Sequence, residues 1–216
     1  MYQAAQFDVL GRLDKQIQSG CHFSNFDSST TSTFAATESI LFSSPISPLT
    51  LGKHGLTELP WSFPHILKSQ GYRTIFLTSA RSGWHQLGNI MSHQGFDQII
   101  DAGSLSVQYP NAELGIWWVW DEYAFDWLKQ WLEKDDSEKP YFIFVLTSTN
   151  HPPYDTPKNF IAPQRDSTLW KGEGGDPQLE KNLDTYVYSA DLLGKFVEWH
   201  RQSTSVTGVQ TCALPI

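Results

Sequence analysis

Cysteine and basic residues are scarce in this chain, and long apolar runs are missing. Two cysteines among 216 residues exclude a disulfide-dense scaffold and a cysteine-rich zinc module. The 15 Lys and Arg residues stand against 23 Asp and Glu, a formal net charge of −8, so the basic face of a nucleic-acid-binding protein is not expected. No stretch approaches the roughly 20 apolar residues of a membrane-spanning helix, and the first residues lack the layout of a secretory signal. The composition is that of a globular domain.

Several familiar sequence motifs are absent as well. The chain has neither the Gly-x-x-x-x-Gly-Lys-Ser/Thr phosphate loop nor the Gly-x-Gly-x-x-Gly fingerprint of dinucleotide-binding proteins. It also lacks the Gly-x-Ser-x-Gly nucleophile elbow, and its histidines and cysteines are not paired at the spacing of a zinc site. These absences leave those enzyme classes without support.

The last eleven residues, 206–216, closely resemble the translation of a sequencing-library adapter. A genuine C-terminal segment is the alternative. On the adapter interpretation, residues 206–216 are a non-native tail that is excluded from fold reasoning. Cys21 is then the only natural cysteine, because Cys212 lies in the tail. The chain is expected to be a metagenomic fragment in which residues 1–205 form a partial domain.

Helical and extended patterns alternate between residues 60 and 148. Residues 73–78 form a short apolar run, and residues 96–100 form a second extended stretch. The strongest strand signal is the nearly continuous apolar run 141–146, which is typical of a strand covered on both faces, as in parallel sheets. Helices that alternate with buried strands predict an α/β layered domain with a mainly parallel sheet.

The sequence also indicates where the predicted helices begin and end. A short amphipathic helix follows Ser62, a second spans residues 83–93, and a third starts near Asp121, a natural N-cap. Trp84, Leu87, Ile90 and Met91 share one face of the second helix. Residues 179–202 are predicted to form one long helix, after a Pro- and Gly-rich loop at 151–178. Long loops of this kind are often functional.

Hydroxyl residues follow one another from Ser28 to Thr33, directly before an apolar stretch that begins at Phe34. This pattern predicts a helix N-terminus. Free N–H groups and the positive end of the helix dipole suit an anion such as phosphate there. A hydroxyl held at that place becomes a nucleophile if a metal or a base lowers its pKa. Plain N-capping by these hydroxyls is the alternative.

Further candidate ligand-binding residues directly follow the predicted strands. His151 comes after the run 141–146, and ligands of open α/β sheets bind beyond the carboxyl ends of strands. Arg81 and Trp84 follow the earlier strand, where Arg81 is placed to meet an anion and Trp84 to cover a substrate. A loop histidine without a role and a strand-to-helix turn with a core tryptophan are the alternatives. The stripe 117–120 is expected to serve mainly in packing or as a lid, and a binding role is the alternative.

Short segments between Phe7 and Arg201 carry a family resemblance in their order and spacing. They are Leu13-Asp14-Lys15, Phe23-Ser24-Asn25-Phe26, Ser29 to Thr33, Leu67 to Thr74, Gly95-Phe96-Asp97 and Asn150-His151-Pro152. As an ordered set they resemble the sulfatase-like catalytic domain of the lipoteichoic-acid synthase and phosphoglycerol transferase family, within the alkaline phosphatase superfamily. In this alignment Thr33 takes the position of the family's nucleophilic threonine.

The resemblance implies an alkaline-phosphatase-like sandwich, with a mainly parallel sheet flanked by helices, of which this chain is an incomplete part. It implies that Thr33 attacks a phosphodiester and ligates a divalent cation, Mn²⁺ or Mg²⁺, with Zn²⁺ as an alternative. His151 and Trp84 are implied to contact a phosphoglycerol or phosphoethanolamine head group, with Arg81 as a weaker candidate. The implied partners are a phospholipid head-group donor and a glycan or lipid acceptor. The implied location is the extracytoplasmic face of a bacterial membrane or the periplasm, with membrane attachment through upstream segments.

The sequence also departs from the family pattern. An acidic metal ligand at the end of a strand is missing before Phe7, and an Asp-His pair is missing after Arg201. Gln86 stands where a basic residue often follows the site tryptophan, and the surroundings of Cys21 lack the formylglycine motif of true sulfatases. We therefore expect the remaining metal ligands outside residues 1–216 and the chain itself to be inactive. A sulfatase-like hydrolase without formylglycine, or an inactive member that binds an anionic glycan or lipid, is the alternative.

Overall fold

The computed structural model describes residues 8–18, 20, 23, 25, 27–28, 30–44, 48–115, 119–164 and 177–203. Cys21, Ser29, Trp117 and Trp118 lie outside the described residues, as do the later part of the expected loop, 165–176, and the tail 206–216.

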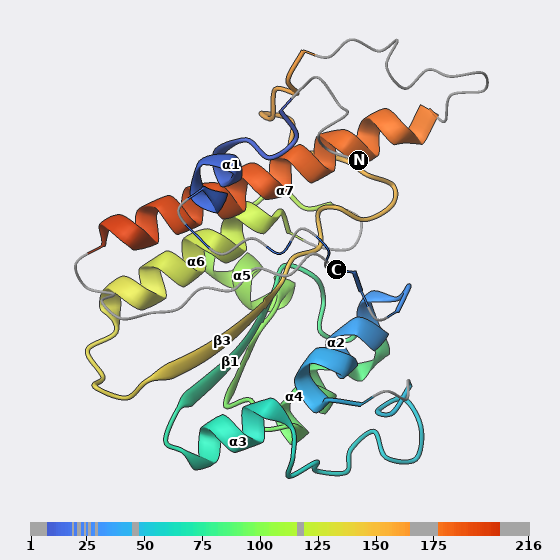
Figure 1. Ribbon diagram of the computed structural model, residues 1–216, viewed down its shortest axis with the longest axis vertical. Helices are drawn as coiled ribbons and strands as arrows, with labels where there is room; N and C mark the ends of the chain where they lie inside the picture. The colour runs from blue at the N-terminus through green and yellow to red at the C-terminus, as the bar shows by residue number, and fades with distance from the viewer. Residues whose placement is uncertain are drawn as a thin grey trace.

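Three parallel strands form the sheet (Figure 1). β1 (Arg73–Thr78) lies between β2 (Gln98–Ile100) and β3 (Tyr141–Leu146). β1 pairs with β3 along its whole length, so that Thr78 lies opposite Leu146. The strands predicted at 73–78 and 141–146 are confirmed, whereas the extended stretch 96–100 contributes only its last three residues to the sheet.

Helices surround this sheet (Figure 1). In chain order the helical elements are α1 (Arg12–Ile17), α2 (Thr33–Phe42), α3 (Phe63–Ser69), η2 (Trp84–Gln86), α4 (Leu87–His93), α5 (Ala102–Gln108), α6 (Asp121–Lys134) and α7 (Pro177–Gln202). The helices expected after Ser62, near Asp121 and over 179–202 are therefore present. Within the described ranges, no helix combines the length and apolarity that a bilayer crossing requires.

Alternate side chains of β3 serve two hydrophobic clusters, one on each face of the sheet. Phe144 and Leu146 join the cluster formed with α2 and α4, while Ile143 and Val145 pack against the cluster formed with α5, α6 and α7. Successive residues of a strand point to opposite faces, so a strand between two helical layers is apolar at nearly every position. The predicted α/β architecture with a parallel sheet is confirmed.

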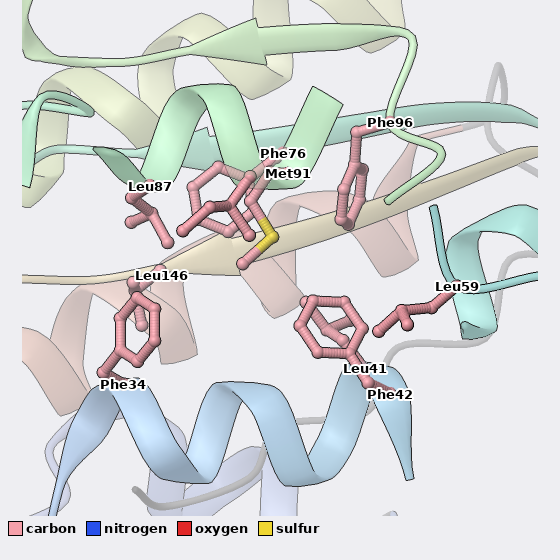
Figure 2. Packing of buried hydrophobic residues seen from close by; sticks show 10 residues of the cluster. Phe34, Leu41, Phe42, Leu59, Phe76, Leu87, Met91, Phe96 and Leu146 are labelled. Carbon is pink, nitrogen blue, oxygen red and sulfur yellow. The ribbon is translucent and has the colours of Figure 1, made fainter. Parts of the chain in front are cut away.

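The first cluster holds α2 on the sheet (Figure 2). Phe34, at the start of α2, points toward Leu146 at the end of β3, and Leu41 and Phe42 extend the contact at the other end of the helix. All four side chains are buried. Each such burial contributes roughly 1.5–3 kcal/mol. The contact therefore fixes the start of α2, and with it Thr33, at the edge where β3 ends.

α1 lies along α7, although the two helices are far apart in the sequence (Figure 1). The backbone N–H of Arg12 donates to Asp191 Oδ1 at 3.0 Å, so a carboxylate of α7 caps the start of α1. Gly194 permits this close packing, because a Cβ at that position would lie 2.2 Å from the backbone nitrogen of Leu13.

Two local expectations are wrong. The helix expected over 83–93 is broken, because His85 and Gln86 adopt left-handed φ angles of 47° and 55°, which a right-handed helix does not accommodate. Trp84 therefore lies outside α4 and is 49% exposed, whereas Leu87, Ile90 and Met91 are buried. Asp121 is not an N-cap either: it is the first residue of α6, and Trp120 holds the cap position.

The remaining sequence-based expectations differ little from the structure. The expectation that the stripe 117–120 serves in packing agrees with Val119 and Trp120, which are both buried. α5 was not expected from the apolar pattern. The long helix begins at Pro177, two residues before its expected start, and residues 151–164 contain neither helix nor strand.

Candidate active site

The candidate site lies where β1 and β3 end. Because the strands are parallel and in register, Thr78 and Leu146 lie side by side, and Thr78 Oγ1 donates to the Leu146 carbonyl at 2.9 Å. The segment after β1 carries Arg81 and Trp84, and the segment after β3 carries His151. The two predicted site segments therefore start from one edge of the sheet, where α/β proteins bind their ligands.

A buried carboxylate joins these two segments. Asp121 accepts hydrogen bonds from the Ser79 hydroxyl, from the backbone N–H of Ser148 at 2.9 Å and from that of Thr149 at 3.1 Å. Asp121, Ser79 and Thr149 are all fully buried. A charged group is tolerated in such surroundings only when donors surround it. Sequence reasoning missed this role; the available signal was a small hydroxyl residue directly after each strand and an aspartate at the start of a helix.

A second carboxylate holds the outer part of the segment after β1. Asp101 caps α5, since its Oδ1 accepts from the backbone N–H of Ser104 at 3.0 Å. Its Oδ2 accepts from the backbone N–H of Ser82 at 3.1 Å and from the Ser82 hydroxyl at 2.6 Å. Burial opposes ionisation of Asp101, but these hydrogen bonds outweigh it and lower the pKa of the carboxyl. The segment 79–82, which leads to Trp84, is thus tied at both ends.

Thr33 is the first residue of α2, and its side chain is exposed. The Thr33 hydroxyl makes no hydrogen bond within the described residues, while the Thr33 carbonyl accepts from Thr37 Oγ1 at 2.9 Å. Ser32 occupies the N-cap position, but its side chain makes no capping bond. The predicted helix N-terminus is confirmed, and its first N–H groups are not taken up by a hydroxyl cap, which leaves them for solvent or an anion.

Trp84 reaches the start of α2. Its ring centroid lies 5.8 Å from that of Phe34 in an edge-to-face arrangement, and 4.5 Å from the His85 ring. Aromatic pairs of this kind contribute about 0.5–1.5 kcal/mol beyond their buried area. Because Phe34 directly follows Thr33, the structure brings the predicted Trp84 beside the turn that carries the predicted nucleophile.

Arg81 and His151 are exposed on the two strand-end segments. The backbone N–H of Trp84 donates to the Arg81 carbonyl at 3.2 Å, so Arg81 and Trp84 share one turn. The backbone N–H of His151 donates to the Thr149 carbonyl at 2.8 Å, and His151 Nδ1 lies 2.8 Å from the Pro152 carbonyl oxygen. No side-chain hydrogen bond or ion pair joins Arg81 to Thr33 in the part of the chain that the structure describes.

Metal-ligating side chains do not gather in the described ranges: no group of three or more His, Cys, Asp and Glu residues there could hold a metal ion. Hard divalent cations prefer several oxygen ligands, usually with carboxylates among them. Among the described residues Thr33 is the one predicted metal ligand, and a single neutral hydroxyl does not form such a site.

Solved structures share this fold. Three of them are an alkaline phosphatase superfamily protein from Vibrio parahaemolyticus (TM-score 0.73, 24% identity), the lipoteichoic acid synthase LtaP from Listeria monocytogenes (0.75, 20%) and the phosphoglycerol transferase GacH from Streptococcus pyogenes in complex with sn-glycerol-1-phosphate (0.61, 18%). The matches cover 91%, 92% and 91% of this chain but 46%, 47% and 52% of those chains. The chain therefore spans about half their length, and at these identities the likeness shows that the chain shares their fold.

Sequence comparison gives the family. An uncharacterized protein of Haemophilus influenzae is 28% identical over 94 residues, which are 41% of this chain and 17% of that protein. The family model described as Sulfatase matches residues 7–206, a range that contains all the ordered segments that carry the resemblance. The chain belongs to the sulfatase family.

Proposed function

We propose that this chain is part of the catalytic domain of an enzyme that transfers or hydrolyses a phosphodiester-linked head group, phosphoglycerol or phosphoethanolamine, with Thr33 as the nucleophile. The observation that carries the proposal is the exposed Thr33 hydroxyl in the first turn of α2, where Ser32 makes no capping bond. Two proteins of the same fold, a lipoteichoic acid synthase and a phosphoglycerol transferase, support the substrate class.

In the proposed reaction Thr33 Oγ1 gives up its proton as it attacks the phosphorus of the donor. The bond from phosphorus to the donor's alcohol oxygen breaks, that oxygen keeps the electron pair and takes a proton, and the head group remains as a phosphothreonine ester. An acceptor hydroxyl or water then attacks the same phosphorus, and Thr33 regains its electron pair and a proton. The first N–H groups of α2 face the non-bridging oxygens, where a helix N-terminus stabilises negative charge.

Three other side chains bind the head group in this proposal. Trp84 covers it, because the ring lies at the start of α2 and is half exposed. Arg81 pairs with a phosphate oxygen, as guanidinium groups do with oxyanions. His151 donates a hydrogen bond to the head group from the segment beyond β3.

A divalent cation, Mn²⁺ or Mg²⁺ with Zn²⁺ as the alternative, belongs to the proposal through the family. The donor set for such an ion is not present among the described residues, which offer Thr33 and no group of three ligands. No step above therefore depends on the ion. We further propose a phospholipid as head-group donor, a glycan or lipid as acceptor, and a location on the extracytoplasmic side of a bacterial membrane.

Sulfate-ester hydrolysis is the second candidate, because the matching family model is itself described as Sulfatase. A sulfate ester and a phosphodiester both present tetrahedral oxyanions to the first turn of α2. Position 33 holds a threonine, which is not the Cys or Ser from which sulfatases form formylglycine, so we rank this candidate lower.

The test is covalent trapping in the intact protein that contains this chain. The protein is incubated with a phosphatidylglycerol or phosphatidylethanolamine donor, quenched and digested, and the peptide that contains Thr33 is analysed by mass spectrometry. A phosphoglycerol or phosphoethanolamine adduct on Thr33 is expected. Turnover of a chromogenic sulfate ester without the adduct would favour the second candidate, and saturable binding without turnover would indicate an inactive glycan- or lipid-binding member.

A further inference from the structure

Asp121 accepts hydrogen bonds from both strand-end segments. It accepts from Ser79, directly beyond β1, and from the backbone N–H groups of Ser148 and Thr149, directly beyond β3. The hydroxyl oxygens of Ser79 and Ser148 also lie 2.5 Å apart. One buried carboxylate therefore links the segment that carries Trp84 to the segment beyond β3, next to the bond from Thr78 Oγ1 to the Leu146 carbonyl.

α6 gives this carboxylate a fixed support. Asp121 is the first residue of the helix, where the helix dipole favours negative charge by about 0.3–1 kcal/mol or more. Phe125 and Leu128 bury the following turns of α6 in the second hydrophobic cluster, and the backbone N–H of Asp121 donates to Thr149 Oγ1 at 3.3 Å. The carboxylate cannot move away from the strand ends unless the whole start of α6 moves.

The hydrogen bonds continue from this point to the predicted site residues. The Thr149 carbonyl accepts from the backbone N–H of His151 at 2.8 Å, and the Ser79 carbonyl accepts from the backbone N–H of Val119 at 3.1 Å. A displacement of Thr149 reaches His151 through one hydrogen bond. A displacement of Ser79 reaches the turn of Trp84 through the segment 79–82, whose last residue, Ser82, is bonded to Asp101.

We propose that Asp121 is a positioning residue, which holds the segments beyond β1 and β3 at the separation at which Trp84 and His151 contact one bound head group. The catalytic consequence of this role rests on the proposed function. The positioning itself rests on the hydrogen bonds alone, because Asp121 acts through Ser79 and Thr149 and not on the substrate.

The test compares two carboxylates at opposite ends of one helix. Asp121→Asn keeps the size of the side chain but turns one acceptor into a donor, which then opposes the N–H of Thr149. Asp135→Asn is the matched control: Asp135 follows the last residue of α6 and pairs with Arg73, at the other end of β1, with Arg73 Nη1 at 2.8 Å from Asp135 Oδ1. Both variants lose a charged hydrogen bond, but only the first loses it at the candidate site.

Hydrogen–deuterium exchange of this chain gives a readout that does not depend on activity. Residues 79–84 and 148–151 are expected to exchange roughly tenfold faster or more in Asp121→Asn and to be unchanged in Asp135→Asn. Equal exchange in both variants would overturn the positioning role. If Asp121→Asn does not fold, Ser79→Ala removes the hydroxyl that donates to Asp121 and contacts the Ser148 hydroxyl, while the N–H groups of Ser148 and Thr149 keep the carboxylate as their acceptor. Faster exchange that is largest at residues 79–84 is then the expected result, and unchanged exchange there would overturn the role.

Kinetics of the intact enzyme give the second readout. For a chromogenic phosphodiester, kcat/KM is expected to fall about 10–100-fold in Asp121→Asn, since small misplacements of binding groups cost about that much, and less than about threefold in Asp135→Asn. Equal losses in the two variants would overturn the positioning role. A wild-type enzyme without phosphodiester turnover would instead contradict the proposed function, and the exchange result would still decide whether Asp121 positions the two segments.

Discussion

The candidate site combines two regions of opposite character. Beyond β1 and β3, Ser79, Asp121 and Thr149 are fully buried and their polar groups have partners. At the start of α2, Thr33 is exposed and its hydroxyl makes no hydrogen bond within the described residues. A saturated, buried network resists movement, whereas an unengaged hydroxyl at a helix N-terminus is available to a ligand. The first region suits the placing of side chains, and the second suits reaction.

The difference is not one of stability alone, because α2 is itself well anchored. Its apolar face packs on the sheet through Phe34, Leu41 and Phe42, and Glu38 accepts from the backbone N–H groups of Leu49 at 3.1 Å and Thr50 at 2.8 Å. A firmly held helix thus presents a first turn without a hydroxyl cap. Variants that affect one region and spare the other sharpen this comparison.

The largest effect is expected at the reactive end. Thr33→Ala in the intact enzyme should lower phosphodiester turnover by more than about 10³-fold, because removal of a nucleophile removes the covalent step. The free energy of unfolding should change little, since the Thr33 side chain is exposed. Initial rates with a chromogenic phosphodiester and a urea titration measure the two quantities.

Thr31→Ala and Ser32→Ala are the controls for this assignment. Both residues are exposed neighbours of Thr33 in the same turn, and both variants should keep most of the activity. If Thr33→Ala stays active while one of the two neighbours becomes inactive, the nucleophile has been assigned to the wrong hydroxyl.

The second prediction concerns the anchored part of α2. Glu38→Ala should lower the free energy of unfolding by about 2–4 kcal/mol, because it leaves the buried N–H of Thr50 and the partly buried N–H of Leu49 without their acceptor and opens a cavity. Glu38→Gln keeps one acceptor and should cost less, and Ser39→Ala on the same helix should cost less than about 0.5 kcal/mol. A urea titration in which all three variants match the wild type would show that α2 does not depend on Glu38.

The third prediction tests whether the segment beyond β3 contributes to binding as well as to the scaffold. His151→Ala in the intact enzyme should reduce kcat/KM about 10–150-fold, which corresponds to the roughly 1.5–3 kcal/mol of a hydrogen bond to a charged group. The fold should survive, because His151 is exposed. His93→Ala is the matched control, since His93 is also exposed but lies before β2, away from the strand ends. Equal rates for both variants would make His151 a loop histidine without a role.

The strands and the start of α2 were accessible from the sequence because each leaves a local signal. A strand between two helical layers needs apolar side chains in both directions, and β3 shows this as an unbroken run. The hydroxyl residues before Phe34 likewise indicate the start of α2. β3 begins at the predicted residue, Tyr141, and α2 begins at Thr33, the last residue of the hydroxyl run that predicts its N-terminus.

The features that were missed depend on backbone geometry or on distant partners. The break at His85 and Gln86 arises from left-handed conformations of residues that are not glycine, so the apolar spacing of Trp84 and Leu87 gave no warning. The role of Asp121 depends on Ser79 and Thr149, which lie 42 and 28 residues away. An aspartate that caps a helix and an aspartate that accepts hydrogen bonds from two distant segments look alike in a sequence. Only the fold distinguishes them.

The smallest effect is expected at Asp101, where the segment that leads to Trp84 is held by a partly exposed carboxylate. Because the pKa of Asp101 is lower in the folded protein than its ordinary value of 3.8, the unfolded chain binds this proton first as the pH falls. The stability that the ionised carboxylate contributes is therefore complete above the ordinary value and is lost as the pH falls through it toward the folded pKa.

Asp101→Asn should flatten this part of the stability curve, since an amide does not titrate. Urea titrations of the wild type and the variant from about pH 7 to about pH 3 measure the effect. The difference between the two proteins is the diagnostic quantity, because Asp97 and Asp135 also have lowered pKa values and affect both proteins alike. The stability lost through the variant should shrink as the pH falls. A loss that stays constant over this range would show that the hydrogen bonds from Ser82 and Ser104 do not depend on the charge of Asp101.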